Sequence, residues 1–251
     1  SEKTALKVIE RVKNKCEINP LDFLKISISF GVATKESKDT DINKILKKAE
    51  NRMYFNKLKE SKEAKFLMIM SLKSRLEKIT YETKSHCERL KNLCMVMAEA
   101  LNLTEIEKDK LRLLCEFHDI GKIGVSKNIL QKQGRLNNEE WENVRRHSEI
   151  GYYIAKEFKD ASPVDELILI HHERWDGKGY PGLLKNAEIP IVARIFAIAD
   201  AYDVMVNDRP YKTRMNNRQA LNEIKDKSGS QFDPNIADIF INIMGIEEQI
   251  V

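Results

Sequence analysis

The stretch His171–Pro181, HHERWDGKGYP, places two adjacent histidines directly after the apolar run PVDELILI. Neighbouring residues on a helix point about 100° apart, so we expect His171 and His172 to serve different metal ions. For an isolated pair of histidines, capping of helix carbonyls is the simpler alternative. The residues that follow are typical of a loop: Asp176, Gly177, Gly179 and Pro181. The first hypothesis is therefore a site for two metal ions at these histidines, followed by a loop rich in glycine and proline.

The chain has five histidines, and each lies where a helix is predicted to begin or end: His86, His118, His147, His171 and His172. His118 is followed at once by Asp119 in FHDIGK, where Gly121 is predicted to end an apolar helix. Asp200 lies within the apolar segment RIFAIADAYDVM. A buried carboxylate needs a partner, and a metal ion is the simplest one.

Sequence signals for helix ends place these groups. Thr104 with Glu107, and Asn137 with Glu140, have the spacing of capping boxes and predict the start of two helices. The first helix leads to His118 and the second to His147. A third helix is predicted to start at Pro190 and to carry Asp200, and Asp233 with Pro234 predicts the start of the last one: ADIFINIM.

Several motifs, in order and near the expected spacing, resemble those of the HD-GYP family, the bacterial phosphodiesterases that open cyclic di-GMP. The resemblance runs from about Leu72 to Pro234. It rests on six segments: TYETKSHCERL, HDIGKIGV, RRHSEIG, HHERWDGKGYP, ARIFAIADAYDVMVNDRPYK and GSQFDP. One departure is that GYPGLLKNAEIP carries its glycine at Gly182, one position earlier than the family usually has it.

The resemblance implies an enzyme that hydrolyses cyclic di-GMP to pGpG, or further to GMP, with two or three divalent ions, iron or manganese. The implied metal ligands are Glu82, His86, His118, Asp119, His147, His171, His172 and Asp200. Asp119 is expected to bridge two ions, which lower the pKa of the attacking water. Lys122 is expected to stabilise charge on the phosphoryl oxygens.

The implied substrate-binding residues are Lys122, Gly179, Tyr180, Pro181, Arg209 and Lys212. Arginine and lysine suit a ligand with two phosphodiesters. Alternatives remain open for three positions. Arg209 and Lys212 also fit solvated surface charge, and Glu82 also fits a solvated glutamate in a first helical turn.

Two other functions stay open at this point. One is a catalytically silent sensor that binds cyclic di-GMP and signals to a partner. The other is a hydrolase of another cyclic dinucleotide, such as cyclic GMP-AMP. The complete ligand series argues against the sensor, whereas nothing in the motifs selects the bases.

Residues 1–60 precede these motifs and predict a helix at 2–16, a strand at 25–33 and a helix at 41–59. This order resembles the C-terminal end of a GGDEF domain, without the signature needed to make cyclic di-GMP. We therefore expect a small truncated α/β module at 1–60, a connecting helix at 61–84 and a mainly α, all-helical HD-type domain at 85–251. The pattern of the connecting helix favours two structures equally: a parallel coiled coil with a second copy in a homodimer, or an amphipathic helix packed on its own domain.

Composition limits the remaining classes of function. Residues 1–60 carry 14 Lys or Arg against 9 Asp or Glu, and the whole chain of 251 residues has a net charge of +4. With no arginine-rich helix or aromatic RNA motif, general nucleic-acid binding is not expected. We expect no bilayer-spanning run and no signal peptide, and the cysteines include no CxxC pair. We expect a cytoplasmic protein, and the missing initial Met suggests a fragment.

Overall fold

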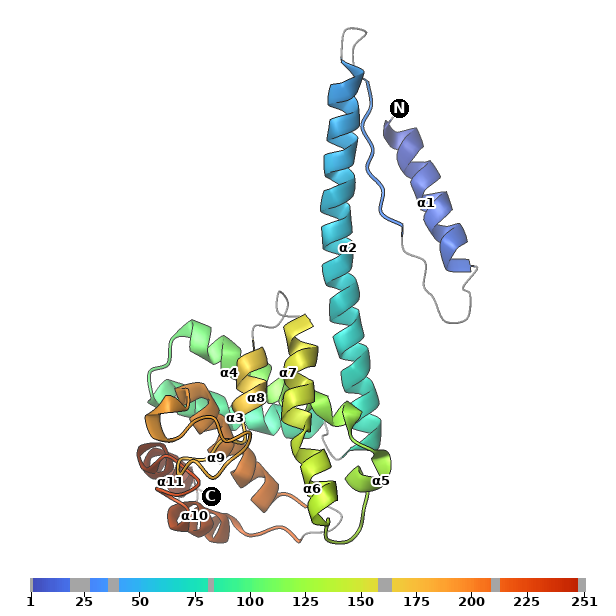
Figure 1. Cartoon of the computed structure of the whole chain (residues 1–251). Coiled ribbons are helices and arrows are strands. Elements are labelled where there is room, and N and C mark those ends of the chain that lie inside the picture. Colours follow the sequence, from blue (N-terminus) through green and yellow to red (C-terminus); the bar gives the residue numbers. More distant parts are fainter. Residues whose placement is uncertain are drawn as a thin grey trace. The chain divides into compact units, whose positions relative to one another are not determined.

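The computed structural model describes residues 2–18, 28–35, 41–80, 84–157, 164–208 and 213–247. The chain divides into two units, Ser1–Met68 and Ile69–Val251. Figure 1 shows the helices of both, and α2 (Ile42–Ile79) crosses the boundary between the units. The segments predicted as a second helix of the first module and as a connecting helix thus form one continuous helix of 38 residues.

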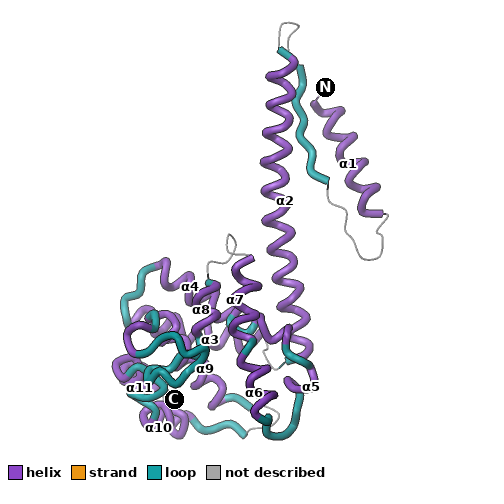
Figure 2. Tube along the Cα trace, in the orientation of Figure 1, coloured by secondary structure: helices purple, strands orange, loops and turns teal. Residues whose placement is uncertain are grey.

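The first unit consists of α1 (Glu2–Ile18), an extended segment and the N-terminal part of α2. Figure 2 shows the segment as a loop beside α2. Arg52 of α2 donates to Glu2 of α1 and to the carbonyl of Val32, at 2.7 and 2.5 Å. A Cβ at Gly31 would lie 1.9 Å from the carbonyl oxygen of Ala49, so the backbones approach closely.

The predicted strand at 25–33 is wrong over its described part, because residues 28–35 form no strand. A strand needs a second strand to pair its backbone N–H and C=O groups, and no other described segment of this unit supplies one. Side chains of α2 bond the carbonyls of this segment instead.

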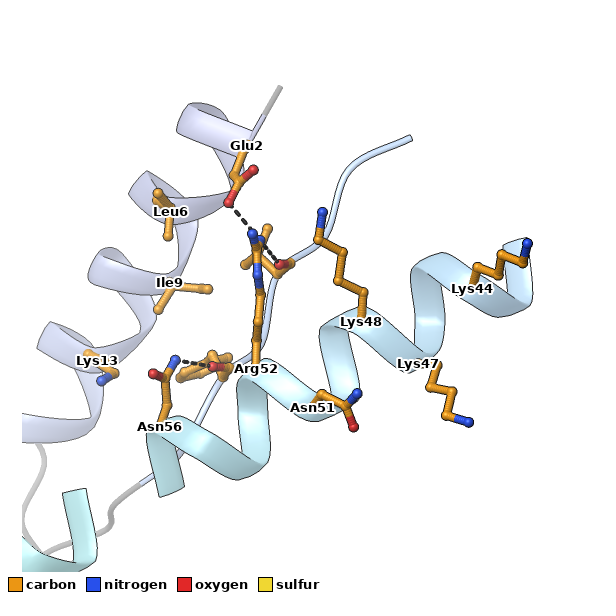
Figure 3. A pocket seen from close by; sticks show the side chains of 12 residues that line it. Glu2, Leu6, Ile9, Lys13, Lys44, Lys47, Lys48, Asn51, Arg52 and Asn56 are labelled. Carbon is orange, nitrogen blue, oxygen red and sulfur yellow. Dashed lines mark hydrogen bonds and ion pairs between the residues drawn. The ribbon is translucent and has the colours of Figure 1, made fainter. Parts of the chain in front are cut away.

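A cavity of about 860 Å³ in this unit is lined by Leu6, Phe30, Arg52 and several lysines (Figure 3), and no predicted site residue lines it.

The second unit is helical, and the described part of the chain contains no β-sheet, only an isolated bridge between Ser228 and Phe232. After α2 come α3 (Lys84–Ala100), α4 (Glu105–Phe117), η1 (Ile120–Gly124), α5 (Lys127–Leu130), α6 (Asn138–Arg145), α7 (His147–Glu157) and α8 (Asp165–Ile170). The rest are η2 (Asn186–Glu188), α9 (Ile191–Val206), α10 (Asn217–Asp226) and α11 (Pro234–Glu247). The prediction of an all-helical domain is confirmed.

Helix α9 is the centre of this unit and packs against α3, α4, α10 and α11. Its residues Ile195, Phe196, Ile198 and Ala199 are fully buried. A mostly apolar helix belongs in a core, and this one also carries Asp200, which stays partly exposed. Helix α7 packs against α8 and η1, which brings the HDIGK segment beside His147 of α7 and His171 at the end of α8.

The predicted helix starts are confirmed. Thr104 and Glu107 form a capping box at the start of α4, and Asn137 and Glu140 form one at the start of α6. Pro190 is the residue before α9. None of the described helices has both the length and the unbroken apolarity needed to cross a membrane.

Candidate metal centre

All five histidines and the two predicted aspartates meet where α3, α4, α7, α8 and α9 come together. Six of them, all except Asp119, form two groups, and within each group the possible ligand atoms lie within 4.8 Å of one another. One group contains His86, His118 and Asp200, and the other contains His147, His171 and His172. These side chains are buried except His172 and Asp200, which are partly exposed.

Asp119 joins the two groups. Its Oδ2 lies 3.1 Å from Nε2 of His118, and its Oδ1 lies 3.3 Å from Nε2 of His147. Each carboxylate oxygen therefore faces a histidine of a different group. This is the arrangement that a carboxylate bridging two metal ions requires.

Backbone carbonyls orient two of the imidazoles. Nδ1 of His147 donates to the carbonyl of Val144 at 2.7 Å, and Nδ1 of His171 donates to that of Ile168 at 2.6 Å. With the proton on Nδ1, the lone pair is on Nε2, and the two Nε2 atoms lie 3.3 Å apart. Two lone pairs that face each other in a buried site repel, and a cation relieves this repulsion.

The charge states also suit a metal. Burial lowers the pKa of His172 to about 3. Burial is also the main cause that lowers the pKa of His171 well below its ordinary value, and the neighbouring His172 and His147 lower it further. Both rings are therefore neutral at pH 7. Burial acts to raise the pKa of Asp119, but Lys122 and then His118 hold it well below its ordinary value. Neutral imidazoles around an ionised carboxylate are the donor set of a divalent metal site.

A buried carboxylate supports His86 from behind. Nδ1 of His86 donates to Oδ2 of Asp203 at 2.7 Å, and Asp203, 2% exposed, also accepts from Nε and Nη2 of Arg89 at 2.6 and 2.9 Å. Asn207 donates a further hydrogen bond to the same carboxylate. A carboxylate behind a ligand histidine fixes its ring and tautomer. Sequence reasoning did not assign this role to Asp203, although its position three residues after Asp200 put it near the same helix face.

Gly121 explains how the two groups come so close. A Cβ at this position would lie 1.9 Å from the carbonyl oxygen of His147 and 2.4 Å from the amide nitrogen of Gly151. The prediction that Gly121 ends a helix is wrong: α4 ends at Phe117, and Gly121 lies in the following 3-10 turn. Its role is to let η1 touch α7, and this contact sets Asp119 against His147.

The structure groups His171 and His172 together with His147, whereas the sequence predicted that the two histidines serve different ions, and which ion each one binds stays a prediction. Helix α8 ends at Ile170, so His172 lies in a turn where the helical angle of 100° no longer applies. The two rings are tilted by 41° with centroids 4.0 Å apart.

Lys122 contacts the centre directly. Its Nζ donates to Oδ2 of Asp119 at 2.6 Å, the oxygen that also faces His118. Its contact in this structure is thus with the carboxylate of Asp119, and its predicted contact with a phosphoryl oxygen stays a prediction.

The GYP loop forms one wall of a cavity of about 560 Å³ beside the centre, to which Gly179, Tyr180 and His172 contribute. The Tyr180 ring lies 4.6 Å from that of His172, centroid to centroid. Pro181 follows Tyr180 through a cis peptide bond. A Cβ at Gly179 would lie 2.5 Å from the carbonyl oxygen of His172, so only glycine fits there.

Glu173, which sequence reasoning missed, holds this loop. It is 4% exposed, and its Oε1 accepts from the amides of Gly182 and Leu183 at 2.9 and 2.7 Å. Gly182 has φ of +82°, a conformation that favours glycine, so the shifted glycine of this sequence meets a requirement of the loop as it is built here.

Three predicted site residues, Glu82, Arg209 and Lys212, lie outside the described residues.

Comparisons with known proteins identify the family of the chain. The family model described as "HD domain" matches residues 67–236. The chain is 40% identical over 166 residues to a cyclic di-GMP phosphodiesterase of Thermotoga maritima, covering 64% of this chain and 45% of that protein. It is 31% identical to 3'3'-cGAMP-specific phosphodiesterase 2 of Vibrio cholerae, covering 74% of this chain and 36% of that protein. The chain thus spans less than half the length of these two relatives.

Two solved structures share the fold. A cyclic GMP-AMP specific phosphodiesterase of V. cholerae has a TM-score of 0.54 at 21% identity, covering 71% of this chain and 48% of that one. An HDG"Y"P protein of Bdellovibrio bacteriovorus has a TM-score of 0.54 at 16% identity, covering 84% of this chain and 75% of that one. The family match, the cyclic di-GMP phosphodiesterases among the relatives and the helical fold agree with one another. The chain belongs to the HD domain family, of the HD-GYP type.

Proposed function

We propose that this protein is a metal-dependent phosphodiesterase that hydrolyses cyclic di-GMP to pGpG, and further to GMP if a third ion is held by Glu82. The observation that carries the proposal is Asp119, whose two oxygens face one histidine from each of two buried groups. The identities of relatives named as cyclic di-GMP phosphodiesterases support it.

The residues present fit two divalent ions, iron or manganese. His86, His118 and Asp200 would hold one, His147, His171 and His172 the other, and Asp119 both. Such ions supply Lewis acidity toward a phosphoryl oxygen and lower the pKa of a water molecule. The mixed nitrogen and oxygen donors suit iron or manganese better than calcium or magnesium.

The other side chains bind and orient the substrate. Lys122 supplies a positive charge next to the bridging carboxylate. The cavity beside His172 is lined by three cations, Arg145, Arg174 and Lys178, of which Arg145 pairs with Glu142 and Arg174 with Asp176. The group keeps one net positive charge, which favours a ligand with two phosphodiesters. Arg209 and Lys212 would add to it.

Finer features belong to the same proposal. Residues 1–60 are a remnant of a GGDEF domain, 61–84 connect it to the catalytic domain of 85–251, and the protein acts in the cytoplasm. Pairing of connecting helices would make a homodimer. A second substrate, cyclic GMP-AMP, is favoured by one observation, namely the identity to a relative named as specific for 3'3'-cGAMP.

The test is anaerobic reconstitution with iron, manganese or zinc, followed by chromatography of the products from cyclic di-GMP, cyclic GMP-AMP and cyclic di-AMP. We expect linear dinucleotide from cyclic di-GMP with iron or manganese, and no turnover by His147→Ala. Tyr153→Ala is a matched control because this exposed residue lies on the same helix, outside the two groups. Binding of cyclic di-GMP without turnover under every metal would instead favour the silent sensor.

A further inference from the structure

Helix α6 is placed beside the metal centre but buries none of its residues. In an ordinary surface helix, the residues at i, i+3, i+4 and i+7 form an apolar face packed on the core. Here the residues at this spacing are Asn138, Trp141, Glu142 and Arg145, and all four line the cavity beside the centre. We name these four residues the α6 face. Trp141 is 49% exposed, so packing does not account for a tryptophan at this position.

The opposite wall of the cavity connects to the chemistry. It includes His172, a member of one metal group, and Tyr180, whose ring lies against that of His172. Arg145 of the α6 face lies over the Tyr180 ring, with its guanidinium carbon 5.5 Å from the centroid. The volume of about 560 Å³ is in the range of small-molecule sites. A substrate whose phosphodiester lies at the metals therefore extends a nucleoside toward the α6 face.

The chemistry of the α6 face suits a purine base. An indole offers a flat surface on which any base stacks. Glu142 offers a carboxylate, which only accepts hydrogen bonds. Guanine presents two neighbouring donors, N1–H and the N2 amino group, and so pairs with both oxygens of a carboxylate. Adenine presents one donor and one acceptor on the same edge, and its acceptor would face a carboxylate oxygen.

The positions of the two side chains agree with this division of roles. Trp141 and Glu142 are adjacent in the helix, so their directions differ by about 100°, close to the right angle between the face and the edge of a base. Nη1 of Arg145 donates to Oε1 of Glu142 at 2.9 Å, and side chains of this pair are 49% and 69% exposed. Such an exposed ion pair is weak and opens at little cost to a base.

We propose that the α6 face is the base-recognition site of this enzyme: Trp141 stacks on a purine, and Glu142 accepts hydrogen bonds from N1 and N2 of guanine. The enzyme therefore prefers a guanine at this position and rejects adenine. This inference rests on the proposed function and names the determinant of its substrate choice.

The test compares kcat/KM for cyclic di-GMP, cyclic GMP-AMP and cyclic di-AMP in the metal-loaded wild type, Glu142→Gln and Trp141→Ala. Glu139→Gln is the matched control, since Glu139 is an exposed acid of the same helix that does not line the cavity. Metal content is measured for every variant. A second readout is quenching of tryptophan fluorescence by cyclic di-GMP at 4 °C, in the wild type and in Trp141→Phe.

We expect Glu142→Gln to lower the ratio of kcat/KM for cyclic di-GMP over cyclic di-AMP about tenfold or more, with metal content unchanged. Trp141→Ala should raise KM for all three substrates, and Trp141→Phe should lose most of the quenching. Turnover with an unchanged base preference in Glu142→Gln, or with unchanged KM in Trp141→Ala, overturns the inference and leaves the proposed function standing. A wild type that hydrolyses none of the three overturns both.

Discussion

Replacement of Gly121 by alanine is the most sensitive probe of how the two ligand groups are held together. The new Cβ would lie 1.9 Å from the carbonyl oxygen of His147, whereas real Cβ contacts are not found below 3.0 Å, so η1 and α7 must separate by at least about 1.1 Å. That shift is large against the tolerance of about 0.2 Å in metal–ligand distances. It also acts directly on the pair formed by Asp119 and His147, now 3.3 Å apart.

We therefore expect Gly121→Ala to lose bound metal and to reduce hydrolysis about a hundredfold, the effect of a misplacement of about 1 Å. Overpacking should also lower the free energy of unfolding by about 1–3 kcal/mol. Metal content by mass spectrometry, hydrolysis rates and thermal unfolding check the three effects. Gly134→Ala is the control, because a Cβ there meets no atom within 4 Å. Wild-type metal content and activity in Gly121→Ala would refute the argument that this contact aligns the centre.

Three further perturbations test the supporting residues and the charge states. Asp203→Ala should weaken metal binding about 10–100-fold in a metal titration, because His86 loses the acceptor that fixes its ring; unchanged affinity would contradict this role. Glu173→Ala should raise KM with metal content unchanged, because the GYP loop loses two amide hydrogen bonds, and an unchanged KM would show that the loop holds itself. His172 has a pKa of about 3 in the folded protein against about 6.5 in the unfolded chain. Its contribution to the free energy of unfolding is therefore present in full above pH 6.5 and is lost as the pH falls toward 3. The metal-free protein should therefore lose up to about 1.4 kcal/mol per pH unit from this residue below pH 6.5, with a flatter pH profile of unfolding in His172→Gln; equal profiles would contradict it.

Local signals predicted the helices of the second unit well. The capping boxes at Thr104 and Asn137 start α4 and α6, because side chain and backbone satisfy each other within one turn. The apolar run before His171 and the apolar surroundings of Asp200 likewise predicted buried helices. The predicted ligand set came from the resemblance to the HD-GYP motifs, and the structure brings all of its described members together.

Features that depend on contacts between distant segments were not predictable. The role of Gly121 follows from its approach to the backbone of His147, which its neighbours in sequence do not encode. The grouping of His171 with His172 follows from the end of α8 at Ile170, and a shift of one residue in a helix end changes where a side chain points. Asp203 was visible as a second carboxylate in an apolar helix, but only the fold reveals that it supports His86.

The prediction of a strand in the extended segment of the first unit failed for a related reason. Alternation of side chains predicts a strand only where a partner strand exists, and the described residues of this unit include none. Arg52 and Asn56 bond its carbonyls instead.

Anomalous diffraction from crystals of the reconstituted protein would show whether two metal ions lie on either side of Asp119. Data collected above and below the absorption edge of the bound metal give its position without reference to activity. We expect two peaks, one among His86, His118 and Asp200 and the other among His147, His171 and His172, with Asp119 between them. No peak at these residues, or a single peak that Asp119 does not contact, would contradict it.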